Sequence, residues 1–260
     1  MSTPGESQPG ARQAALGTRS ALLCSDIHLS NDDPELTDRF LSWLERESIR
    51  LKPESIIILG DCFDAWIGDD CLDTAGPNTC ETRLVTCLDQ LAQRGHALYI
   101  MHGNRDFLLG DQFANACAAT LLRDPSVLRI DSGLKILLTH GDQLCTADTD
   151  YQAFRRQLRT GPWQIDFLSK PLAQRQEIAR DLRMQSEHEK SVKSMAIMDV
   201  TDADAAFLTD QFDTDLLLHG HTHRPGRSVM SNGKLRWVLP DWAPPHGGGL
   251  WVDAAGIQAI

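Results

Sequence analysis

Short apolar runs recur along the chain, and a group of polar residues follows each of them. Residues 56–59 are three isoleucines and a leucine, a composition typical of a strand that is buried on both faces. Similar runs occupy 21–24, 97–101, 135–139 and 216–218, and aspartate, asparagine or histidine follows every run within three residues. Ligands of open α/β sheets collect beyond the carboxyl ends of the strands. The five polar groups are therefore expected to lie close together.

Between the first three runs, the apolar positions change to the spacing of helices. Residues 33–52 begin with Asp-Pro, a common helix start, and residues 80–95 end with glycine, a common helix end. A short helix is predicted near 112–119. The run at 135–139 is predicted to form a hairpin with 127–130, because Asp-Ser-Gly lies in the turn between them.

Residues 151–200 interrupt this alternation and are predicted to be helical throughout. Strands resume at 216–218, 234–239 and 249–252. This order of elements predicts the fold class as α/β, with one layered domain over residues 19–260 that carries a helical insertion.

The composition narrows the classes of function. Lysine and arginine number 25 against 36 aspartates and glutamates, a net charge of -11, which argues against a general nucleic-acid binder. Seven cysteines form no C-x-x-C pair, and their odd number favours reduced thiols in the cytosol. Residues 1–18 lack the apolar core of a signal peptide and are expected to be a disordered tail. No apolar run approaches the ~18 residues of a transmembrane helix.

The polar groups after the strands contain aspartate, asparagine and histidine, whose oxygen and imidazole ligands suit divalent cations. The candidate ligands are Asp26, His28, Asp61, Asn104, His140, His219 and His221. Seven ligands exceed what one ion needs and suit two ions that share a carboxylate, for which Asp61 is the natural bridge. Two ions ~3.5–4 Å apart hold the attacking and leaving oxygens of a displacement at phosphorus and activate a bridging water. His102, His223 and Asp64 remain open, either as neighbours of the ligands or as structural residues.

The motifs D-x-H, G-D-x-x-D, G-N-x-D, H-G-D and G-H-T-H occur in this order, and in them the chain resembles the calcineurin-like metallophosphoesterases over about residues 20–252. The resemblance implies a four-layer αββα sandwich with a dinuclear metal centre. In the family's pattern one ion takes Asp26, His28, Asp61 and His221, and the other takes Asp61, Asn104, His140 and His219. Two manganese ions are implied, although the ligands alone also admit iron or zinc.

Longer sequence segments indicate a more specific group within this family. Residues 25–29, 63–70, 102–110, 140–146 and 196–200 are similar to the UDP-2,3-diacylglucosamine pyrophosphohydrolases of lipid A biosynthesis. The resemblance implies that UDP-2,3-diacylglucosamine is cut into UMP and 2,3-diacylglucosamine 1-phosphate. We further expect a cytoplasmic monomer that contacts the cytoplasmic side of the inner membrane peripherally and has no nucleic-acid partner.

The resemblance to the family also implies roles for individual residues. The implied catalytic residues are Asp61, Asn104, Arg105 and His140, and the implied substrate contacts are Asn104, Arg105, Asp148, Ser186, Lys190, Lys193 and His219. Arg105 stands where many related phosphoesterases have a histidine that protonates an alkoxide leaving group. Arginine cannot donate a proton at neutral pH. A phosphate monoester, whose second pKa is ~6, needs no such proton, so the site suits a pyrophosphate bond.

The segment 151–200 differs in charge from the rest of the chain. It holds nine basic and six acidic residues, a net of +3, whereas the remaining 16 basic and 30 acidic residues give -14. This contrast predicts an anionic partner, either substrate phosphate or a membrane surface. Its larger apolar residues are Phe154, Leu158, Trp163, Ile165, Phe167, Leu168 and Leu172. They form either the segment's own core or a lid over a cleft for acyl chains, with Trp163 and Phe167 as candidates for contact with the bilayer edge.

Two other functions stay open at this point. The first is a metallophosphoesterase with another substrate, such as a phosphoprotein or a nucleotide. The second is an interaction module that kept the fold and lost its metals, which metal analysis of the purified protein would distinguish.

Overall fold

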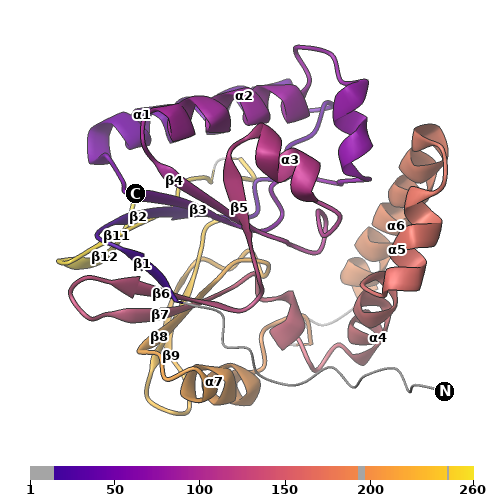
Figure 1. The fold of residues 1–260 in the computed structure, drawn as a ribbon. Coiled ribbons are helices and arrows are strands. Elements are labelled where there is room, and N and C mark those ends of the chain that lie inside the picture. The colour runs from indigo at the N-terminus through magenta and orange to yellow at the C-terminus, as the bar shows by residue number, and fades with distance from the viewer. Residues whose placement is uncertain (1–14, 193–196, 245) are drawn as a thin grey trace, which may run out of the picture.

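The protein is a sandwich of two sheets between layers of helices. The structure is a computed structural model that describes residues 15–192, 197–244 and 246–260, without the side chains of 187–192. Two six-stranded sheets pack face to face, and helices cover the outer face of each sheet (Figure 1). The four-layer αββα arrangement that the family resemblance implies is therefore confirmed.

The first sheet has the strand order β12-β11-β2-β3-β4-β5. Strands β2 to β5 run parallel, so their carboxyl ends reach the same edge, whereas β11 and β12 are antiparallel additions. The strands are β2 (Ala21–Cys24), β3 (Ser55–Leu59), β4 (Ala97–Met101), β5 (Ala119–Leu122), β11 (Leu250–Asp253) and β12 (Gly256–Ala259).

The second sheet has the order β1-β6-β7-β8-β10-β9. Strands β7 and β8 are parallel neighbours, and β6 and β7 form the predicted antiparallel hairpin. The strands are β1 (Leu16–Thr18), β6 (Ser126–Ile130), β7 (Lys135–Thr139), β8 (Leu216–His219), β9 (Gly226–Val229) and β10 (Leu235–Val238).

Strand β3 shows why the central apolar runs have no polar positions. Ile56 and Ile58 belong to the core between the first sheet and its helices, while Ile57 and Leu59 belong to the core between the two sheets. Both faces of the strand are therefore buried, as expected for a sheet covered on both sides.

The helices cover the sheets from outside. Helices α1 (Pro34–Leu51), α2 (Cys80–Gln93) and α3 (Asp111–Ala116) lie on the first sheet, and α7 (Asp202–Gln211) lies on the second (Figure 1). The Asp-Pro start predicted for the first helix is confirmed, because the Asp33 carboxylate accepts a hydrogen bond from the Leu36 amide at 2.9 Å. Two short 3-10 helices, η1 (Asp69–Asp73) and η2 (Asp142–Leu144), belong to the loops after β3 and β7.

The insertion consists of α4 (Thr149–Leu158), α5 (Gly161–Leu168) and α6 (Leu172–Val192). These three helices stand together as a column beside the sandwich (Figure 1). We refer to Thr149–Val192 as the insertion below.

Two predicted boundaries were wrong. Part of the tail expected at 1–18 is ordered instead, because Leu16–Thr18 form β1, which pairs in parallel with β6; residues 1–14 lie outside the described residues. The helix expected to reach residue 119 ends at Ala116, and Ala119–Leu122 form the edge strand β5. Both strands are short and lie at sheet edges, so their pairing partners far along the chain, and not a local pattern, specify them.

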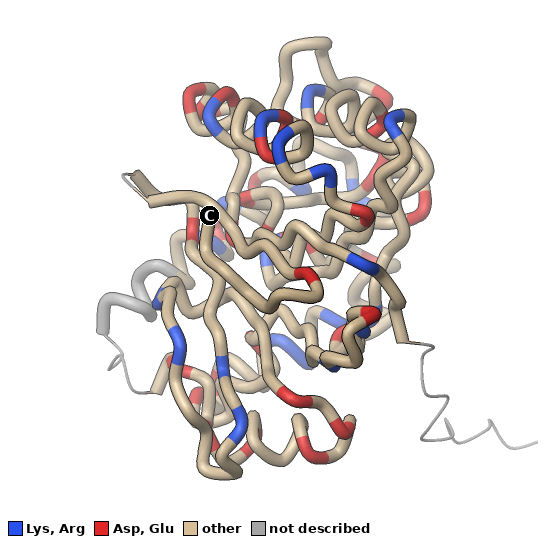
Figure 2. The backbone as a smooth tube through the Cα atoms, turned by 90° about the vertical axis from the view of Figure 1, so that its left-hand side faces the viewer, with Lys and Arg blue, Asp and Glu red and all other residues tan. Residues whose placement is uncertain are grey.

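Within the described residues, none of the helices is long and apolar enough to cross a bilayer. Basic and acidic positions are interspersed along the backbone in Figure 2.

Candidate metal centre

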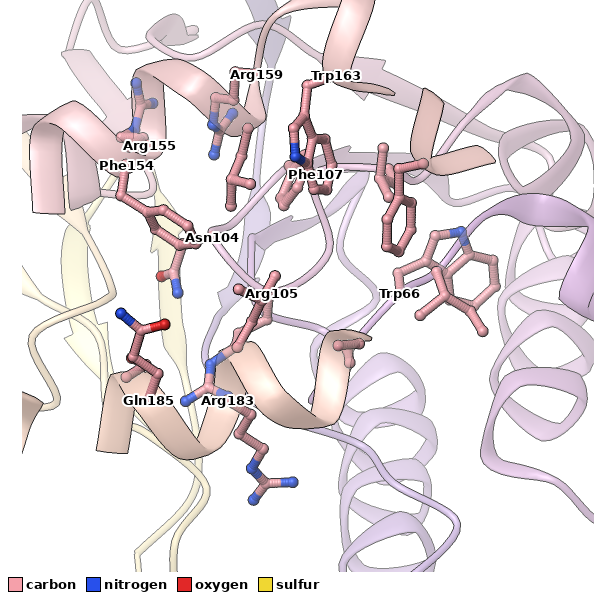
Figure 3. A pocket seen from close by; sticks show the side chains of 18 of the residues that line it. Trp66, Asn104, Arg105, Phe107, Phe154, Arg155, Arg159, Trp163, Arg183 and Gln185 are labelled. Carbon is pink, nitrogen blue, oxygen red and sulfur yellow. The ribbon is translucent and has the colours of Figure 1, made fainter. Parts of the chain in front are cut away.

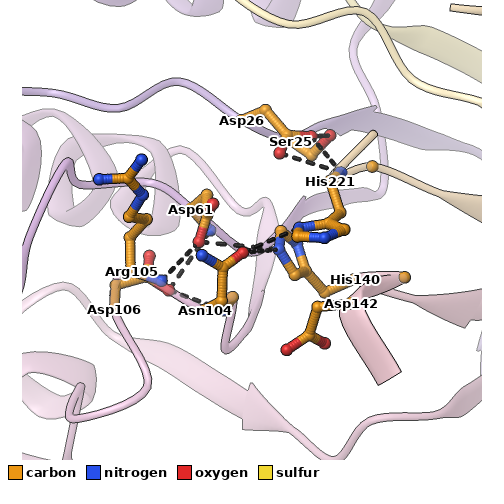
Figure 4. A network of polar contacts seen from close by, with 12 residues as sticks. Ser25, Asp26, Asp61, Asn104, Arg105, Asp106, His140, Asp142 and His221 are labelled. Atoms are coloured by element: carbon orange, nitrogen blue, oxygen red, sulfur yellow. Dashed lines mark hydrogen bonds and ion pairs between the residues drawn. The ribbon is translucent and has the colours of Figure 1, made fainter. Parts of the chain in front are cut away.

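The loops that follow β2, β3, β4, β7 and β8 meet at one place and carry two groups of possible metal ligands. Asp26, His28 and His223 form the first group. Asp61, His140 and His221 form the second, and within each group the ligand atoms lie within 4.8 Å of one another. Figure 4 shows the second group, with the Asn104 amide beside its two imidazoles.

In the first group the His28 and His223 Nε2 atoms are 3.2 Å apart. The His223 Nε2 atom is 3.5 Å from Asp26 Oδ1. His223 Nδ1 lies 3.6 Å from the carboxylate of Asp241, which orients the ring from the side opposite Asp26.

In the second group the Asn104 Oδ1 atom lies 3.1 Å from His140 Nε2 and 2.8 Å from His221 Nδ1. The carboxylate of Asp61 lies between the two groups. Its Oδ2 is 3.9 Å from His28 Nε2, and its Oδ1 is 3.7 Å from His140 Nε2. One oxygen therefore faces each group, which is the geometry that a bridging ligand needs.

These residues fit two divalent cations. Carboxylate and imidazole ligands lie close together in each group, with the Asn104 amide beside the second, and such ligands are typical of sites for hard or borderline ions. The backbone supports the same conclusion, because five of these residues have a positive φ between 51° and 66°. They are Asp26, His28, Asp61, His221 and His223. Such conformations are uncommon outside glycine and cluster at functional sites.

The electrostatics of the protein groups at the centre are strongly coupled. Burial raises the pKa of Asp61 to about 7, and the carboxylates of Asp106 and Asp26 act in the same direction. Burial disfavours the charged imidazole of His140, but Asp61, Asp26 and Asp142 outweigh it and raise the pKa of His140 to about 9. A proton is therefore retained near neutral pH on groups that a cation would use as ligands.

Asp106 aligns the loops of two candidate ligands. Its side chain is fully buried and accepts hydrogen bonds from the amides of Asp61 at 3.3 Å, Cys62 at 2.7 Å and Gly103 at 2.7 Å. The amide of Arg105 in turn donates to Asp61 Oδ1 at 2.8 Å. The acid that ends the G-N-x-D motif thus positions Asp61, a role that the sequence did not indicate.

Glycine is required where two of these loops touch. A Cβ on Gly103 would lie 2.1 Å from Asp61 Oδ1, and a Cβ on Gly220 would lie 2.2 Å from Asp26 Oδ2. Real Cβ atoms do not approach oxygen so closely. The glycines of the G-N and G-H motifs therefore let the ligand loops pack against the aspartates.

A cavity of about 290 Å³ opens between the insertion and the loops after β3 and β4 (Figure 3). Asn104, Arg105 and Ser186 are among its polar lining residues. Much of the remaining lining is apolar and includes Trp66, Phe107, Phe154, Leu158, Trp163 and Phe167. The cavity thus joins part of the candidate metal centre to a surface suited to hydrocarbon.

The sequence profile of the calcineurin-like phosphoesterase family matches residues 20–225. The chain belongs to this family. A solved dimetal phosphatase from Danio rerio shares the fold of this phosphoesterase, with a TM-score of 0.51 and 12% identity over 94% of this chain and 98% of that one.

Several curated relatives of this phosphoesterase are named UDP-2,3-diacylglucosamine hydrolase. The protein from Chromohalobacter salexigens is 42% identical over 90% of this chain and 93% of its own. The protein from Cellvibrio japonicus is 42% identical over 91% of this chain and 95% of its own. The protein from Bordetella pertussis is 42% identical over 92% of this chain and 93% of its own.

The phosphoesterase structure places the histidines after β8 differently from the prediction. His221 lies with Asp61 and His140, where His219 was expected, and His223 lies with Asp26 and His28, where His221 was expected. His219 is fully buried, and its Nδ1 lies 2.7 Å from the carbonyl oxygen of Gly220. It belongs to neither of the two ligand groups and does not line the cavity, so the structure gives no support to the substrate contact predicted for it.

The position of the end of β8 explains why His219 is not in either ligand group. His219 is still inside β8 and is paired with Thr139 and Val238, whereas the other candidate ligands come after their strands have ended. Burial and Arg236 lower the pKa of His219 to about 4, so it stays neutral. The one-residue gap between Asp26 and His28, counted onward from His221, leads to His223, which the sequence left open.

The remaining predicted residues are placed as follows. Arg105 lines the cavity, and its NH1 lies 3.7 Å from Asp64 Oδ1. Asp148 caps α4 by accepting from the Tyr151 amide at 3.1 Å. The Lys190 side chain and the whole of Lys193 lie outside the described residues. His102 Nε2 lies 2.7 Å from the Leu109 carbonyl oxygen and is not in either ligand group.

Several arginines of the insertion form ion pairs with aspartates in other parts of the phosphoesterase. Arg155 and Arg159 pair with Asp142, Arg175 pairs with Asp70, and Arg183 pairs with Asp64. These four arginines hold the insertion against the ligand loops. The anionic partner predicted from the charge contrast is thus in part the protein's own carboxylates.

The apolar residues of the insertion divide between the two predicted roles. Phe167 is buried and stacks on Trp163 with ring centroids 4.9 Å apart, and both line the cavity. Of the two roles left open for Phe167, the structure therefore favours packing inside the protein over contact with the bilayer edge. Ile165 and Leu168, at 73% and 42% exposure, face solvent instead.

Proposed function

We propose that the protein hydrolyses the pyrophosphate bond of UDP-2,3-diacylglucosamine, releasing UMP and 2,3-diacylglucosamine 1-phosphate in lipid A biosynthesis. One observation carries the proposal: a single cavity has Asn104 and Arg105 beside the metal centre and an extensive apolar lining. A substrate for it must combine a phosphate group with hydrocarbon. Relatives 42% identical over about nine tenths of the chain bear the name of the same hydrolase.

We propose the metal ligands from the observed geometry. One ion would take Asp26, His28, Asp61 and His223, and the other would take Asp61, Asn104, His140 and His221. The pair supplies an activated water and charge neutralisation at the phosphorus when it is bound. Manganese is the proposed ion because the family resemblance implies it; the ligand set by itself also admits iron or zinc.

Side chains that line the cavity would bind the diphosphate of the substrate. Arg105 is 15% exposed in its side chain and borders the cavity, where its guanidinium can hold phosphate oxygens in a bidentate manner. It donates no proton, so the leaving group must be stable as an anion, as 2,3-diacylglucosamine 1-phosphate is. Ser186 lines the same cavity. We retain Ser186, Asp148, Lys190 and Lys193 as proposed substrate contacts on the strength of the sequence motifs.

We also propose that the protein is a monomer that binds the cytoplasmic surface of the inner membrane peripherally. Exposed apolar side chains of the insertion support this location, since acyl chains must pass from the bilayer into the cavity. They are Phe154 at 38%, Ile165 at 73%, Leu168 at 42% and Met184 at 55% exposure. An interfacial helix uses such side chains for contact with lipid.

The experiment is to incubate the protein with Mn²⁺ and UDP-2,3-diacylglucosamine and to measure UMP. UMP formation is expected, together with much slower turnover of UDP-N-acetylglucosamine, which lacks the acyl chains. Faster turnover of alkyl phosphates or phosphopeptides than of the acylated substrate would assign the phosphoesterase to another substrate.

The bridging role of Asp61 has a matched control. Asp61→Ala is expected to abolish UMP release while circular dichroism shows an unchanged fold. Asp38→Ala removes an exposed acid of α1, paired with Arg83, and is expected to retain activity. Retained activity in Asp61→Ala would contradict the assignment of the bridge.

A further inference from the structure

Asp142 lies two residues after His140 and faces away from the ligand network (Figure 4). Its side chain is fully buried and accepts hydrogen bonds from Arg155 Nε at 2.6 Å, the Tyr151 hydroxyl at 3.0 Å and Arg159 NH2 at 3.4 Å. All three donors belong to α4 or its carboxyl end. The buried Asp142 carboxylate thus binds α4, the first helix of the insertion, to the loop that carries the candidate ligand His140.

The same helix reaches two further ligand loops. Arg159 donates to the Gly103 carbonyl at 2.9 Å, in the peptide that precedes Asn104. The Tyr151 ring lies against the His221 ring, with centroids 5.9 Å apart and an angle of 28° between the planes. Through Asp142, α4 is therefore held where it touches the loops of His140, Asn104 and His221.

We propose that Asp142 is a positioning residue that couples the metal centre to the insertion. Metal binding would fix the loops of His140, Asn104 and His221 and so stabilise α4 in its docked position. Coupling of two equilibria is reciprocal, so docking of α4 strengthens metal binding by the same factor. Because α4 forms one wall of the substrate cavity, metal binding would also stabilise the cavity.

Asp142 differs from Asp70 and Asp64, the other acids that pair with arginines of the insertion, in the helix that it binds. Arg175 donates to both Asp70 oxygens and to the Ile67 carbonyl, and Arg183 pairs with Asp64. Both arginines belong to α6, so these contacts hold a different helix of the insertion. Asp70→Asn is therefore a matched control, because it weakens one carboxylate–arginine contact of the insertion and leaves α4 in place.

The test is amide hydrogen exchange of the full-length protein with and without Mn²⁺. In the wild type, Mn²⁺ is expected to slow exchange in α4 roughly fivefold or more, the lower end of typical couplings. In Asp142→Asn this effect is lost, since the amide places a donor opposite the arginines and removes the charge. In Asp70→Asn the effect on α4 persists. Calorimetric titration is expected to show Mn²⁺ binding weakened by the same factor in Asp142→Asn.

The proposal is overturned if Asp142→Asn keeps the Mn²⁺-dependent protection of α4, if it binds Mn²⁺ as tightly as the wild type, or if both variants lose the protection equally. Should Asp142→Asn fail to fold, Arg155→Met breaks the same contact from the α4 side and must give the same loss. The proposal rests on the metal centre and not on the lipid substrate. Intact coupling without UMP release would therefore contradict the proposed function alone.

Discussion

At the scale of single residues, the metal centre depends on backbone conformations that ordinary strands and helices do not use. Asp26, His28 and Asp61 all have φ between 51° and 57°. A left-handed conformation costs a residue with a Cβ ~1–2 kcal/mol. Hydrogen bonds between the loops hold it in place, since the Asp26 amide donates to the Gly60 carbonyl at 3.1 Å and the His28 amide to the Asp61 carbonyl at 3.0 Å. The sharp turn after each strand directs the side chain back toward its neighbours.

The close contact at Gly103 gives a prediction. Gly103→Ala places a Cβ 2.1 Å from Asp61 Oδ1 and 2.3 Å from the Asp61 nitrogen, so the Asp61 carboxylate, the proposed bridge, must move. We expect a loss of about 1–3 kcal/mol in the free energy of unfolding, typical of overpacking, and weaker Mn²⁺ binding by calorimetry. Gly161→Ala is the control, because a Cβ there meets nothing within 4 Å. Unchanged metal affinity in Gly103→Ala would contradict the packing argument.

The raised pKa values of Asp61, about 7, and His140, about 9, give a second prediction at this scale. These groups bind metal only when deprotonated, so the affinity for Mn²⁺ is present above these values and is lost as the pH falls through them. We expect affinity to rise by about tenfold per pH unit for each proton released, between pH ~6 and ~9. Calorimetry in buffers of different ionisation enthalpy measures the released protons. Constant affinity with no proton release would refute this expectation.

At the scale of elements, the parallel strands supply the centre and the insertion supplies the cavity. Loops after β2, β3 and β4 come from the first sheet, and loops after β7 and β8 come from the second, so both sheets contribute ligands. The insertion adds an apolar wall and is tied down through Asp142, Asp70 and Asp64. A general phosphoesterase core thereby gains a compartment that suits one class of substrate.

The exposed side of the insertion gives a prediction about membranes. Ile165 is 73% exposed, so Ile165→Gln is expected to leave the folded protein intact. Loss of one buried isoleucine from a lipid contact amounts to ~1.5–3 kcal/mol, so binding to phosphatidylglycerol-containing vesicles should weaken roughly tenfold or more. Ile49→Gln on α1, at 60% exposure, is the matched control and is expected to bind as the wild type does. Equal binding by all three proteins in a flotation assay would remove Ile165 from the membrane contact.

At the scale of the whole molecule, apolar side chains form the cores, and none of the candidate metal ligands is among them. Residues such as Ile57, Leu138 and Leu218 fill the space between the sheets, and Phe40, Leu44 and Leu84 fill the space under the helices. The hydrophobic effect of these cores stabilises the sandwich without help from the ligands. The loops after β2 and β3 also pack into the core under the helices through Ile27 and Cys62, which anchors the neighbouring Asp26 and Asp61 without a metal.

Metal removal should therefore abolish activity without unfolding the protein. After chelation with EDTA we expect an unchanged circular dichroism spectrum and no UMP release, with activity restored by Mn²⁺. Mn²⁺ at a thousandfold excess over its Kd should add about 4 kcal/mol to stability, which corresponds to roughly 10 °C in Tm for a domain of this size. Loss of the native spectrum on chelation would show that the metals hold the fold itself.

Much of this molecule was predictable because its signals are local. A run such as Ile56–Leu59 identifies a buried strand, and Asp33-Pro34 identifies a helix start, from interactions within a few residues. The histidines after β8 were not assigned correctly, since the choice among His219, His221 and His223 depends on where the strand pairing stops. The edge strand β1 and the tie between Asp142 and α4 were missed for a related reason, because their partners lie elsewhere along the chain.

Short segments of the chain were enough to predict the central strands, the main helices, the kind of ligand and the family, because apolar period and residue chemistry are local properties. The tertiary structure alone decided which histidines share a site with Asp26 and Asp61. It also decided that the arginines of the insertion bind the protein's own carboxylates, and that Phe167 faces the cavity. These outcomes depend on distances between segments that are far apart in the chain, and packing of the whole molecule sets those distances.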